Sequence, residues 1–343
     1  MSFSSNLTII KQIGQGGFGD VYEGLDEVHG KVAVKVLRRW PFETEPDWQA
    51  RRNQLLSEAQ NLRSAKHKNV VNVLYVVRSQ QDGNLHLALE FCDGGSLDVR
   101  YKAGPLKISE IRKIATDVCL GLDAIHSRGM LHRDIKPGNI MLSGSRWKIG
   151  DFGLVTDGII LGYASAAGYM DHLAPEVHTD QVTSVKTDVW ALGMTIYRLL
   201  HGDAFYIQGF AGLDVADLVK AGGFAGKLCW LPHIPKEWRK IIRKALHDES
   251  SLRFNSVLDL SQTLGRLPIT PDWRCQVSPN LVRWTLERKG RTVSVEWEVL
   301  SPRKHIWRAS SFGGTRSRKL GGSSAPLGKE KALYQLENFL LSH

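Results

Sequence analysis

The sequence lacks any long hydrophobic run. Its longest nearly continuous apolar stretch, VVNVLYVV at Val70–Val77, is far shorter than the ~20 residues that a membrane helix needs. The first residues, MSFSSNLTIIKQIG, also lack the basic and then apolar pattern of a signal peptide. We therefore expect a chain without a membrane segment.

Cysteine is scarce, and no C-x-x-C pair is present to chelate zinc or to form a redox couple. The four cysteines lie far apart in the sequence, at Cys92, Cys119, Cys229 and Cys275. Reduced thiols are the simplest interpretation, and they are typical of the cytosol. The sequence thus predicts a cytoplasmic protein.

Acidic residues are few only in the last part of the chain. The whole sequence of 343 residues carries a net charge of +10. Residues 266–343 hold 14 Lys and Arg against 6 Asp and Glu, a net charge of +8, which leaves only +2 for residues 1–265. The length suffices for one two-lobed domain with an appendage. The charge distribution indicates that the appendage is the basic part.

A glycine-rich stretch, GQGGFGDVYEG, lies near the N-terminus. Gly14, Gly16 and Gly19 fit G-x-G-x-x-G, a pattern that dinucleotide-binding folds share with protein kinases. In a Rossmann fold this loop opens a helix. Here a short β-rich segment follows, and then KVAVKVL at Lys31–Leu37, with valine at every second position. A glycine-tipped hairpin followed by a third strand is therefore predicted, and this arrangement argues against the Rossmann fold.

A lysine on the third strand would point at the phosphates that such a glycine loop covers. Lys35 occupies this place in VAVK. Its stem needs an acidic partner, and Glu58 lies in a helical segment where Leu55 and Leu62 fall on the same stripe. Glu58 alone could be a solvated helix carboxylate. Its position one strand and one helix after VAVK favours an ion pair with Lys35.

Further along the chain, LHRDIKPGNIML supplies three polar residues within reach of one phosphate. Asp134 would orient a substrate hydroxyl, Lys136 would stabilise the transferring phosphoryl group, and Asn139 would hold a magnesium ion. KIGDFGL follows, in which Asp151 could chelate the metal that bridges the phosphates. The order and the intervals of these motifs favour phosphoryl transfer over chance matches.

Together with APE and DVWALG, these motifs resemble the eukaryotic-type serine/threonine protein kinase family over about Leu7–Leu267. The resemblance implies an α+β, bilobal protein kinase fold. Residues 1–89 would form a β-rich N-lobe and residues 90–267 a helical C-lobe, with ATP between them. It also implies ATP and Mg²⁺ as cofactors, with Mn²⁺ as an alternative metal, and a protein as substrate. Two alternatives are a kinase-fold binding or regulatory module with weak or no activity, and a small-molecule kinase.

The resemblance also assigns roles residue by residue. Catalysis would fall to Asp134, Lys136, Lys35 and Glu58, and metal binding to Asn139 and Asp151. Leu89 would be the gatekeeper, and the backbone of Glu90 and Cys92 would read the adenine edge. The expected ATP-binding residues are Gly14, Gly16, Gly19, Val21, Ala33, Lys35, Leu89, Glu90, Cys92, Ser96 and Met141.

The sequence departs from the family on the substrate side. Kinases that act on serine or threonine usually have a threonine five residues before the alanine of APE, but Tyr169 stands there. The segment between DFG and APE offers few hydroxyl groups for regulation, among them Thr156 and Ser165. Lys136, two residues after Asp134, still favours serine or threonine as acceptor.

The last part of the chain, residues 268–343, matches no motif. LPITPDWRCQVSP has the composition of a proline-rich linker. RTVSVEWEVL alternates apolar and polar residues, as a half-buried strand does, and KEKALYQLENFLLSH has an apolar helical face. We expect a small basic module of three strands and a helix, which would dock substrates or regulate the kinase. Its charge also suggests an acidic protein or nucleic acid as partner. Its tryptophans, Trp284, Trp297 and Trp307, are expected in its core.

Overall fold

The computed structural model describes most of the chain, and it contains two compact units. The first comprises Met1–Leu97 with Asp117–Asp188, and the second comprises Asp98–Thr116 with Val189–His343. At positions 16, 58, 61, 62, 64 and 316 only the backbone is described. The described residues are 7–16, 19–40, 42–64, 66–79, 83–151, 169–313 and 316–342.

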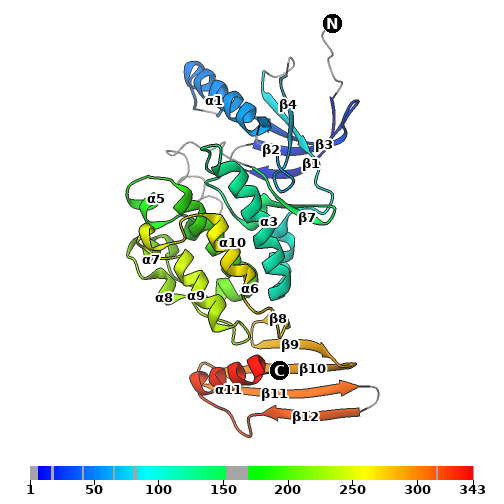
Figure 1. Cartoon of the computed structure of the whole chain (residues 1–343), viewed down its shortest axis with the longest axis vertical. Helices are drawn as coiled ribbons and strands as arrows, with labels where there is room; N and C mark the ends of the chain where they lie inside the picture. Colours follow the sequence, from blue (N-terminus) through cyan, green and yellow to red (C-terminus); the bar gives the residue numbers. More distant parts are fainter. Residues whose placement is uncertain are drawn as a thin grey trace. The chain divides into compact units, whose positions relative to one another are not determined.

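An antiparallel five-stranded sheet forms the start of the first unit (Figure 1). Its strands stand in the order β1-β2-β3-β5-β4. They are β1 (Leu7–Gly16), β2 (Gly19–Asp26), β3 (Gly30–Leu37), β5 (Leu85–Glu90) and β4 (Val73–Arg78). The predicted hairpin followed by a third strand is confirmed.

The alternation along β3 separates a core face from a functional face. Val32, Val34 and Val36 are buried in one cluster, against which Tyr22 and other apolar side chains pack. Because side chains alternate along a strand, Lys35 points to the opposite face. Burying the three valines therefore also fixes the side of the sheet on which the lysine amine lies.

The β1–β2 hairpin requires glycine at Gly19. This residue has φ +138°, and a Cβ atom there would lie 2.2 Å from the backbone oxygen of Val36. Any other residue would clash with β3 and strain the backbone. Gly19 therefore allows the hairpin tip to pack closely against the strand that carries Lys35.

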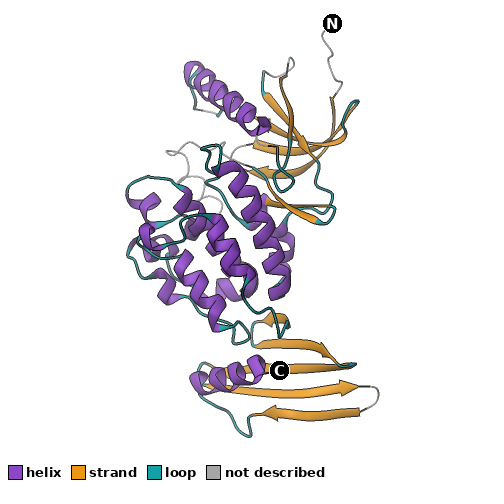
Figure 2. Ribbon diagram, in the orientation of Figure 1, coloured by secondary structure: helices purple, strands orange, loops and turns teal. Residues whose placement is uncertain are grey.

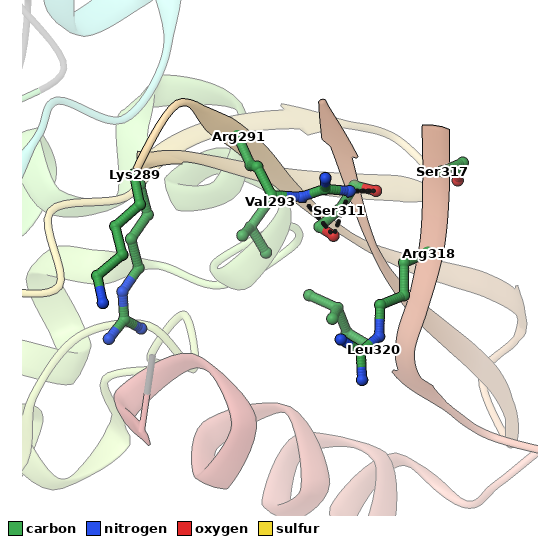
Figure 3. Close-up of a pocket in the computed structure, with 8 residues that line it drawn as sticks. Lys289, Arg291, Val293, Ser311, Ser317, Arg318 and Leu320 are labelled. Atoms are coloured by element: carbon green, nitrogen blue, oxygen red, sulfur yellow. Dashed lines mark hydrogen bonds between the residues drawn. The ribbon is translucent and has the colours of Figure 1, made fainter. Parts of the chain in front are cut away.

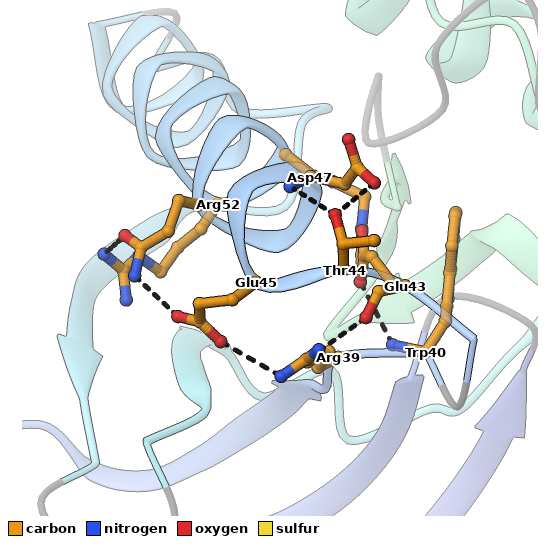
Figure 4. A network of polar contacts seen from close by, with 9 residues as sticks. Arg39, Trp40, Glu43, Thr44, Glu45, Asp47 and Arg52 are labelled. Carbon is orange, nitrogen blue, oxygen red and sulfur yellow. Dashed lines mark hydrogen bonds and ion pairs between the residues drawn. The ribbon is translucent and has the colours of Figure 1, made fainter.

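Helix α1 (Glu45–Ser64) packs against β4 and begins in a polar network (Figure 4). Thr44 caps the helix, because its hydroxyl oxygen accepts a hydrogen bond from the backbone N–H of Asp47 at 3.3 Å. The Arg51 guanidinium bonds both oxygens of Glu43 at 2.7 Å and lies over the ring of Trp40. The Arg51 hydrogen bonds lower the pKa of Glu43 against the opposing effect of burial.

The remainder of the first unit is built from short elements around the functional loops. It includes the second half of α3 (Ile108–His126), which begins in the other unit, and a two-stranded sheet. The short elements are η1 (Pro137–Asn139), β6 (Ile140–Ser143), β7 (Arg146–Ile149), η2 (Met170–His172) and α5 (Pro175–Thr179).

Helices with a large aromatic core make up much of the second unit (Figure 2). Trp190, Trp238, Tyr197 and Phe224 are almost fully buried there. No helix in the described part of the chain is long and apolar enough to cross a membrane. The helical elements of this unit, some shared with the first, are α2 (Leu97–Ala103), α3, α6 (Val185–Gly209), α7 (Val215–Lys220), α8 (Phe224–Lys227), α9 (Lys236–Ala245), η3 (Ser250–Leu252) and α10 (Val257–Gly265).

The basic end of the chain forms a second antiparallel sheet and a closing helix, α11 (Lys329–Ser342). Five strands are present where three were expected, so that prediction was wrong in number. The supposed linker was also partly wrong, because it contains the strand at Arg274–Ser278 and the buried Trp273. In order across the sheet the strands are β12 (Arg316–Gly322), β11 (Lys304–Gly313), β10 (Arg291–Ser301), β9 (Leu281–Arg288) and β8 (Arg274–Ser278).

Several hydrogen bonds join this sheet and its flanks to the helices of the same unit. The indole N–H of Trp238 in α9 donates to the backbone oxygen of Pro268 at 3.0 Å. Asp272 accepts from both the backbone N–H and the hydroxyl of Ser109, at the start of α3. The α+β class predicted from the sequence, with an additional C-terminal sheet and helix, is confirmed.

Candidate active site

The loop after α3 brings three predicted site residues together. Lys136 Nζ donates to Asp134 Oδ2 at 2.8 Å. The side-chain amide nitrogen of Asn139 donates to the same carboxylate oxygen, also at 2.8 Å, and to the backbone oxygen of Asp134. Because η1 turns the chain sharply at Pro137–Asn139, residues five positions apart meet around one carboxylate.

The carboxylate of Asp188 anchors this loop through hydrogen bonds to its backbone. Its two carboxylate oxygens accept the backbone N–H groups of His132 and Arg133, both at 2.9 Å. His126 Nε2 donates to the same carboxylate at 2.7 Å. Burial acts to raise the pKa of Asp188, but the hydrogen bonds and charge interactions with His126 and His132 together bring it below the usual range. The carboxylate thus stabilises the loop at Arg133, whose φ of 68° is unfavourable for a side chain of this size.

Replacing Asp188 with asparagine should therefore destabilise the chain by about 3 kcal/mol. Each carboxylate oxygen faces an N–H donor, so the amide nitrogen would meet a donor in either orientation. The free energy of unfolding, measured in urea, tests this prediction. The exposed Asp180→Asn is the matched control and should change little; equal stability of both variants would contradict the role of Asp188.

Lys35 and Asp151 form an ion pair in the first unit. Lys35 is 3% exposed, whereas the Asp151 side chain is 31% exposed and hence accessible to a ligand. Burial acts to raise the pKa of Asp151, but the charge of Lys35 and its hydrogen bond lower it below the usual range. The carboxylate is therefore ionised at neutral pH, as a metal ligand must be.

His132 connects the two charged groups. Its Nδ1 accepts from the backbone N–H of Asp134 at 3.2 Å, so Nε2 carries the proton and donates to the backbone oxygen of Gly150 at 3.0 Å. Burial lowers the pKa of His132, which keeps the ring neutral and compatible with both bonds. One buried imidazole thereby joins the Asp134 loop to the residue that precedes Asp151.

Some predicted site residues cannot be placed fully. Glu58 lies in α1, but its side chain is outside what the structure describes, so its ion pair with Lys35 stays a prediction. Thr156 and Ser165 also lie outside the described residues. In the glycine loop, Gly14 pairs with Val21, and Gly16 pairs with Gly19 at the hairpin tip.

The residues expected around the adenine come from neighbouring strands. Ala33 of β3 pairs with Leu89 of β5, just before Glu90, and Ser96 forms a bridge with Met141 of β6. Cys92 lies between these segments, and burial raises the pKa of its thiol to about 12. This thiol therefore stays protonated at neutral pH.

Sequence reasoning missed the side-chain network at Glu90. Lys148 Nζ bonds both carboxylate oxygens of Glu90, at 2.6 and 2.7 Å, and the amide of Asn72 donates to one of them at 2.9 Å. The Ser143 hydroxyl also donates to Glu90 at 3.2 Å. These contacts fix the segment whose backbone was expected to read adenine. No motif marks Lys148 or Asn72 for this purpose.

Tyr169 lies beside the Asp134 loop. Lys136 Nζ is 5.5 Å from the centre of the Tyr169 ring, which also contacts the ring of His172 edge-on at 5.0 Å. His172 Nδ1 is 2.8 Å from the backbone oxygen of Ile135. The residue that departs from the family pattern is therefore in contact with the predicted catalytic lysine.

Asn139 and Asp151 have the chemistry that a magnesium site needs. The amide nitrogen of Asn139 donates to Asp134, so its side-chain oxygen is the atom suited to a cation. Asp151 supplies an ionised oxygen ligand. Mg²⁺ commonly takes one or two protein oxygens and completes its shell with phosphate and water, which fits these two residues.

The comparison with known families agrees with this geometry. The model described as "Protein kinase domain" matches residues 7–263, which is most of the chain. The chain therefore belongs to the protein kinase family. The match ends within α10, before the C-terminal sheet begins.

Individual relatives are serine/threonine kinases by name. The chain is 28% identical to the probable serine/threonine-protein kinase PknB of Lactococcus lactis over 75% of its length, and 31% identical to CTR1 of Arabidopsis thaliana over 78%. It is 32% identical to ssp1 of Schizosaccharomyces pombe over 93%. These alignments cover 41%, 32% and 50% of the respective relatives, so the chain matches half or less of each.

Proposed function

We propose that this chain is an ATP-dependent protein kinase that phosphorylates serine and threonine hydroxyls. The observation that carries the proposal is the pair of charged clusters within one unit. One is Lys35 with Asp151, and the other is Lys136 and Asn139 around Asp134. The ordered motifs and the names of the relatives support the same activity.

In the proposed reaction, the acceptor hydroxyl oxygen forms a bond to the γ-phosphorus of ATP. The bond to the bridging β–γ oxygen breaks, and ADP leaves with that electron pair. Asp134 orients the hydroxyl and accepts its proton. Lys136 balances charge on the transferring phosphoryl group, and Lys35 orients the phosphates, with Glu58 as its proposed second partner. Asn139 and Asp151 would hold Mg²⁺, which neutralises phosphate charge.

For nucleotide binding we propose a site that covers both ends of ATP. Gly14, Gly16 and Gly19 would cover the phosphates with backbone N–H groups. The remaining residues would hold the adenosine: Val21, Ala33, Leu89, Glu90, Cys92, Ser96 and Met141. The ion pair between Lys148 and Glu90 supports a fixed backbone at this position.

We further propose that residues 1–267 form the kinase domain and residues 268–343 a basic accessory module. The family match, which ends at residue 263, supports this boundary. An acidic protein or nucleic acid is a candidate partner of the module because of its charge. A cytoplasmic location is proposed because the four cysteines lie far apart in the sequence and form no C-x-x-C pair, which is typical of reduced thiols.

The activity can be tested directly. The purified full chain should transfer labelled γ-phosphate from ATP to proteins of a mixed panel when Mg²⁺ is present. Mapping the labelled positions would also give the substrate preference. A chain that binds ATP but transfers no label under any metal condition would instead be a kinase-fold binding module.

Replacing Tyr169 with threonine should preserve or raise transfer to serine and threonine peptides. The tyrosine ring contacts Lys136, and losing a cation–π contact of about 0.5–1 kcal/mol changes rates by roughly two- to five-fold at most. A threonine would restore the short hydroxyl that the family has at this position. The ratio kcat/KM on matched peptides measures the effect.

Tyr169→Phe is the control for this variant, because it retains the ring over Lys136 and should leave kcat/KM unchanged. If the Tyr169→Thr variant instead phosphorylated tyrosine, or lost all transfer, Tyr169 would not occupy the place of the family's threonine, and the loop would be built differently from the family pattern.

A further inference from the structure

One face of the C-terminal sheet, here called its inner face, carries buried apolar side chains at one end of the strands and basic side chains at the other. Residues directly opposite on neighbouring antiparallel strands point to the same face. One such row contains the buried Trp284, Val295 and Ala309. The next rows along the same face contain Val293, Ser311 and Arg318, and then Arg288 paired with Arg291. An apolar core thus gives way to cations on one continuous surface.

These cations line a cavity of about 510 Å³ (Figure 3). Four of the residues that line it are basic, two are serines, two are aliphatic and none is acidic: Arg288, Lys289, Arg291, Arg318, Ser311, Ser317, Val293 and Leu320. Figure 3 shows Lys289 at the β9–β10 turn on one side, with Arg318 on the opposite side. Positive charge is therefore concentrated around a single hollow.

Arg291 is held in place before any ligand binds. Its Nε and Nη2 atoms donate to the hydroxyl oxygen of Ser311 at 3.3 Å, and Nη2 also donates to the Ser311 backbone oxygen at 3.3 Å. Gly313 makes room for it, because a Cβ atom there would lie 2.8 Å from Arg291 Nη1. A pre-ordered guanidinium loses less conformational entropy when it binds an anion.

Nearby carboxylates are engaged away from the cavity. Glu287 accepts a hydrogen bond from the Thr292 hydroxyl at 2.7 Å. Because side chains alternate along a strand, Thr292 points to the face opposite to that of Arg291 and Val293, which line the cavity. Glu296 pairs with Arg283, which likewise lies on the outer face of the sheet. These acids neutralise charge on the outer face, whereas the lining of the cavity carries an excess of positive charge that an anion would balance.

The residues that line the cavity favour a compact phosphate group over a nucleic-acid strand as its ligand. Single-stranded nucleic acid usually binds by stacking its bases on aromatic side chains. Trp284, Trp297 and Trp307 are buried, and none of them lines the cavity. A phosphomonoester carries nearly two charges on one group, whereas each phosphodiester of a nucleic acid carries one. Several cations around one hollow match the phosphomonoester better.

We propose that this cavity binds the phosphorylated serine or threonine of a partner protein. Arginine clusters recognise phosphoserine and phosphothreonine through charge-assisted, bidentate hydrogen bonds. The proposal deepens the proposed function, since it makes a phosphorylated protein the ligand of the accessory module. Binding itself requires no phosphoryl transfer, and the cavity would tether a phosphorylated partner to the chain that carries the active site.

The test uses the full chain carrying Asp134→Asn and treated with phosphatase, so that its own phosphorylation cannot fill the cavity. The probe is a fluorescent peptide library with one fixed phosphoserine and random flanking residues. We expect it to bind about tenfold more tightly than the same library with unphosphorylated serine. Arg318→Ala should abolish this difference, and Lys289→Asn should reduce it. Asparagine suits position 289, where φ is 50°.

Lys319→Ala is the matched control, because Lys319 is the next residue on β12 and points to the opposite face. It should leave the preference for phosphoserine intact. Equal binding of both libraries, an equal loss with Lys319→Ala, or no binding would overturn the proposal. Stronger binding of a mixed-sequence oligonucleotide than of the phosphoserine library would also overturn it and assign a nucleic acid. Because Asp134→Asn is used throughout, a negative result here is distinct from failure of wild-type transfer.

Discussion

Replacing Asp151 with asparagine should lower metal-dependent phosphoryl transfer by roughly 10²–10³-fold while the fold is retained. Lys35 keeps the pKa of Asp151 low, so the wild-type chain presents an ionised oxygen to the metal. An amide is neutral and a poorer magnesium ligand. The backbone should tolerate the change, because asparagine, like aspartate, accepts the φ of 61° found at this position.

The measurement is kcat at saturating ATP over a range of Mg²⁺ concentrations, with the melting temperature as the test of folding. Asp217→Asn, at an exposed position on α7, is the matched control and should retain activity. Near-normal turnover of Asp151→Asn would remove Asp151 from the proposed metal site.

Replacing Lys35 with methionine should reduce transfer by a similar factor, roughly 10²-fold or more. Methionine has nearly the same length but no charge, so it cannot orient phosphates. It also removes the ion-pair partner of Asp151, while the partial burial that acts to raise the pKa of that carboxylate remains. The pKa of Asp151 should therefore rise in this variant.

The pKa of Asp151 makes this second prediction dependent on pH. A carboxyl group with a lowered pKa in the folded state stabilises the fold above its unfolded-state pKa, and this stabilisation is lost as the pH falls through the folded-state value. Lys35→Met should consequently be less stable than wild type at neutral pH. The difference should shrink as the pH falls below 3.8, the ordinary value for aspartate.

Unfolding free energies of wild type, Lys35→Met and Lys35→Arg between pH 3 and 7 would test this dependence. Lys35→Arg retains the charge and should keep the wild-type pH profile, even though it need not restore transfer. Wild-type transfer by Lys35→Met, or a stability difference that does not depend on pH, would contradict the role of the pair.

How far the sequence predicts the site depends on how local each contact is. Asp134, Lys136 and Asn139 lie within one short motif, and they meet as expected. The alternation of valines around Lys35 predicts β3 and the face on which the lysine lies. The Lys148–Glu90 pair was missed, because 58 residues separate the two and neither charge stands in a motif that requires a partner.

The C-terminal sheet shows the same limit. Its central strand β10 has the strict alternation of a half-buried strand, and it was predicted. The edge strands β8 and β12 were missed because an edge strand needs little apolar surface. β12 has the sequence RSRKLGG, whose charged residues and glycines lack the apolar alternation that would predict a strand. Contacts such as that of Trp238 with Pro268 depend on tertiary packing and leave no local pattern.

The identity of the phosphorylated amino acid tests the proposed serine/threonine kinase activity most directly. Wild type and Asp134→Asn would be incubated in parallel with Mg²⁺, γ-labelled ATP and peptide libraries whose fixed acceptor is serine, threonine or tyrosine. We expect that wild type labels the serine and threonine libraries and that Asp134→Asn labels none. Labelling confined to tyrosine, equal labelling by both chains, or no labelling by wild type would contradict it.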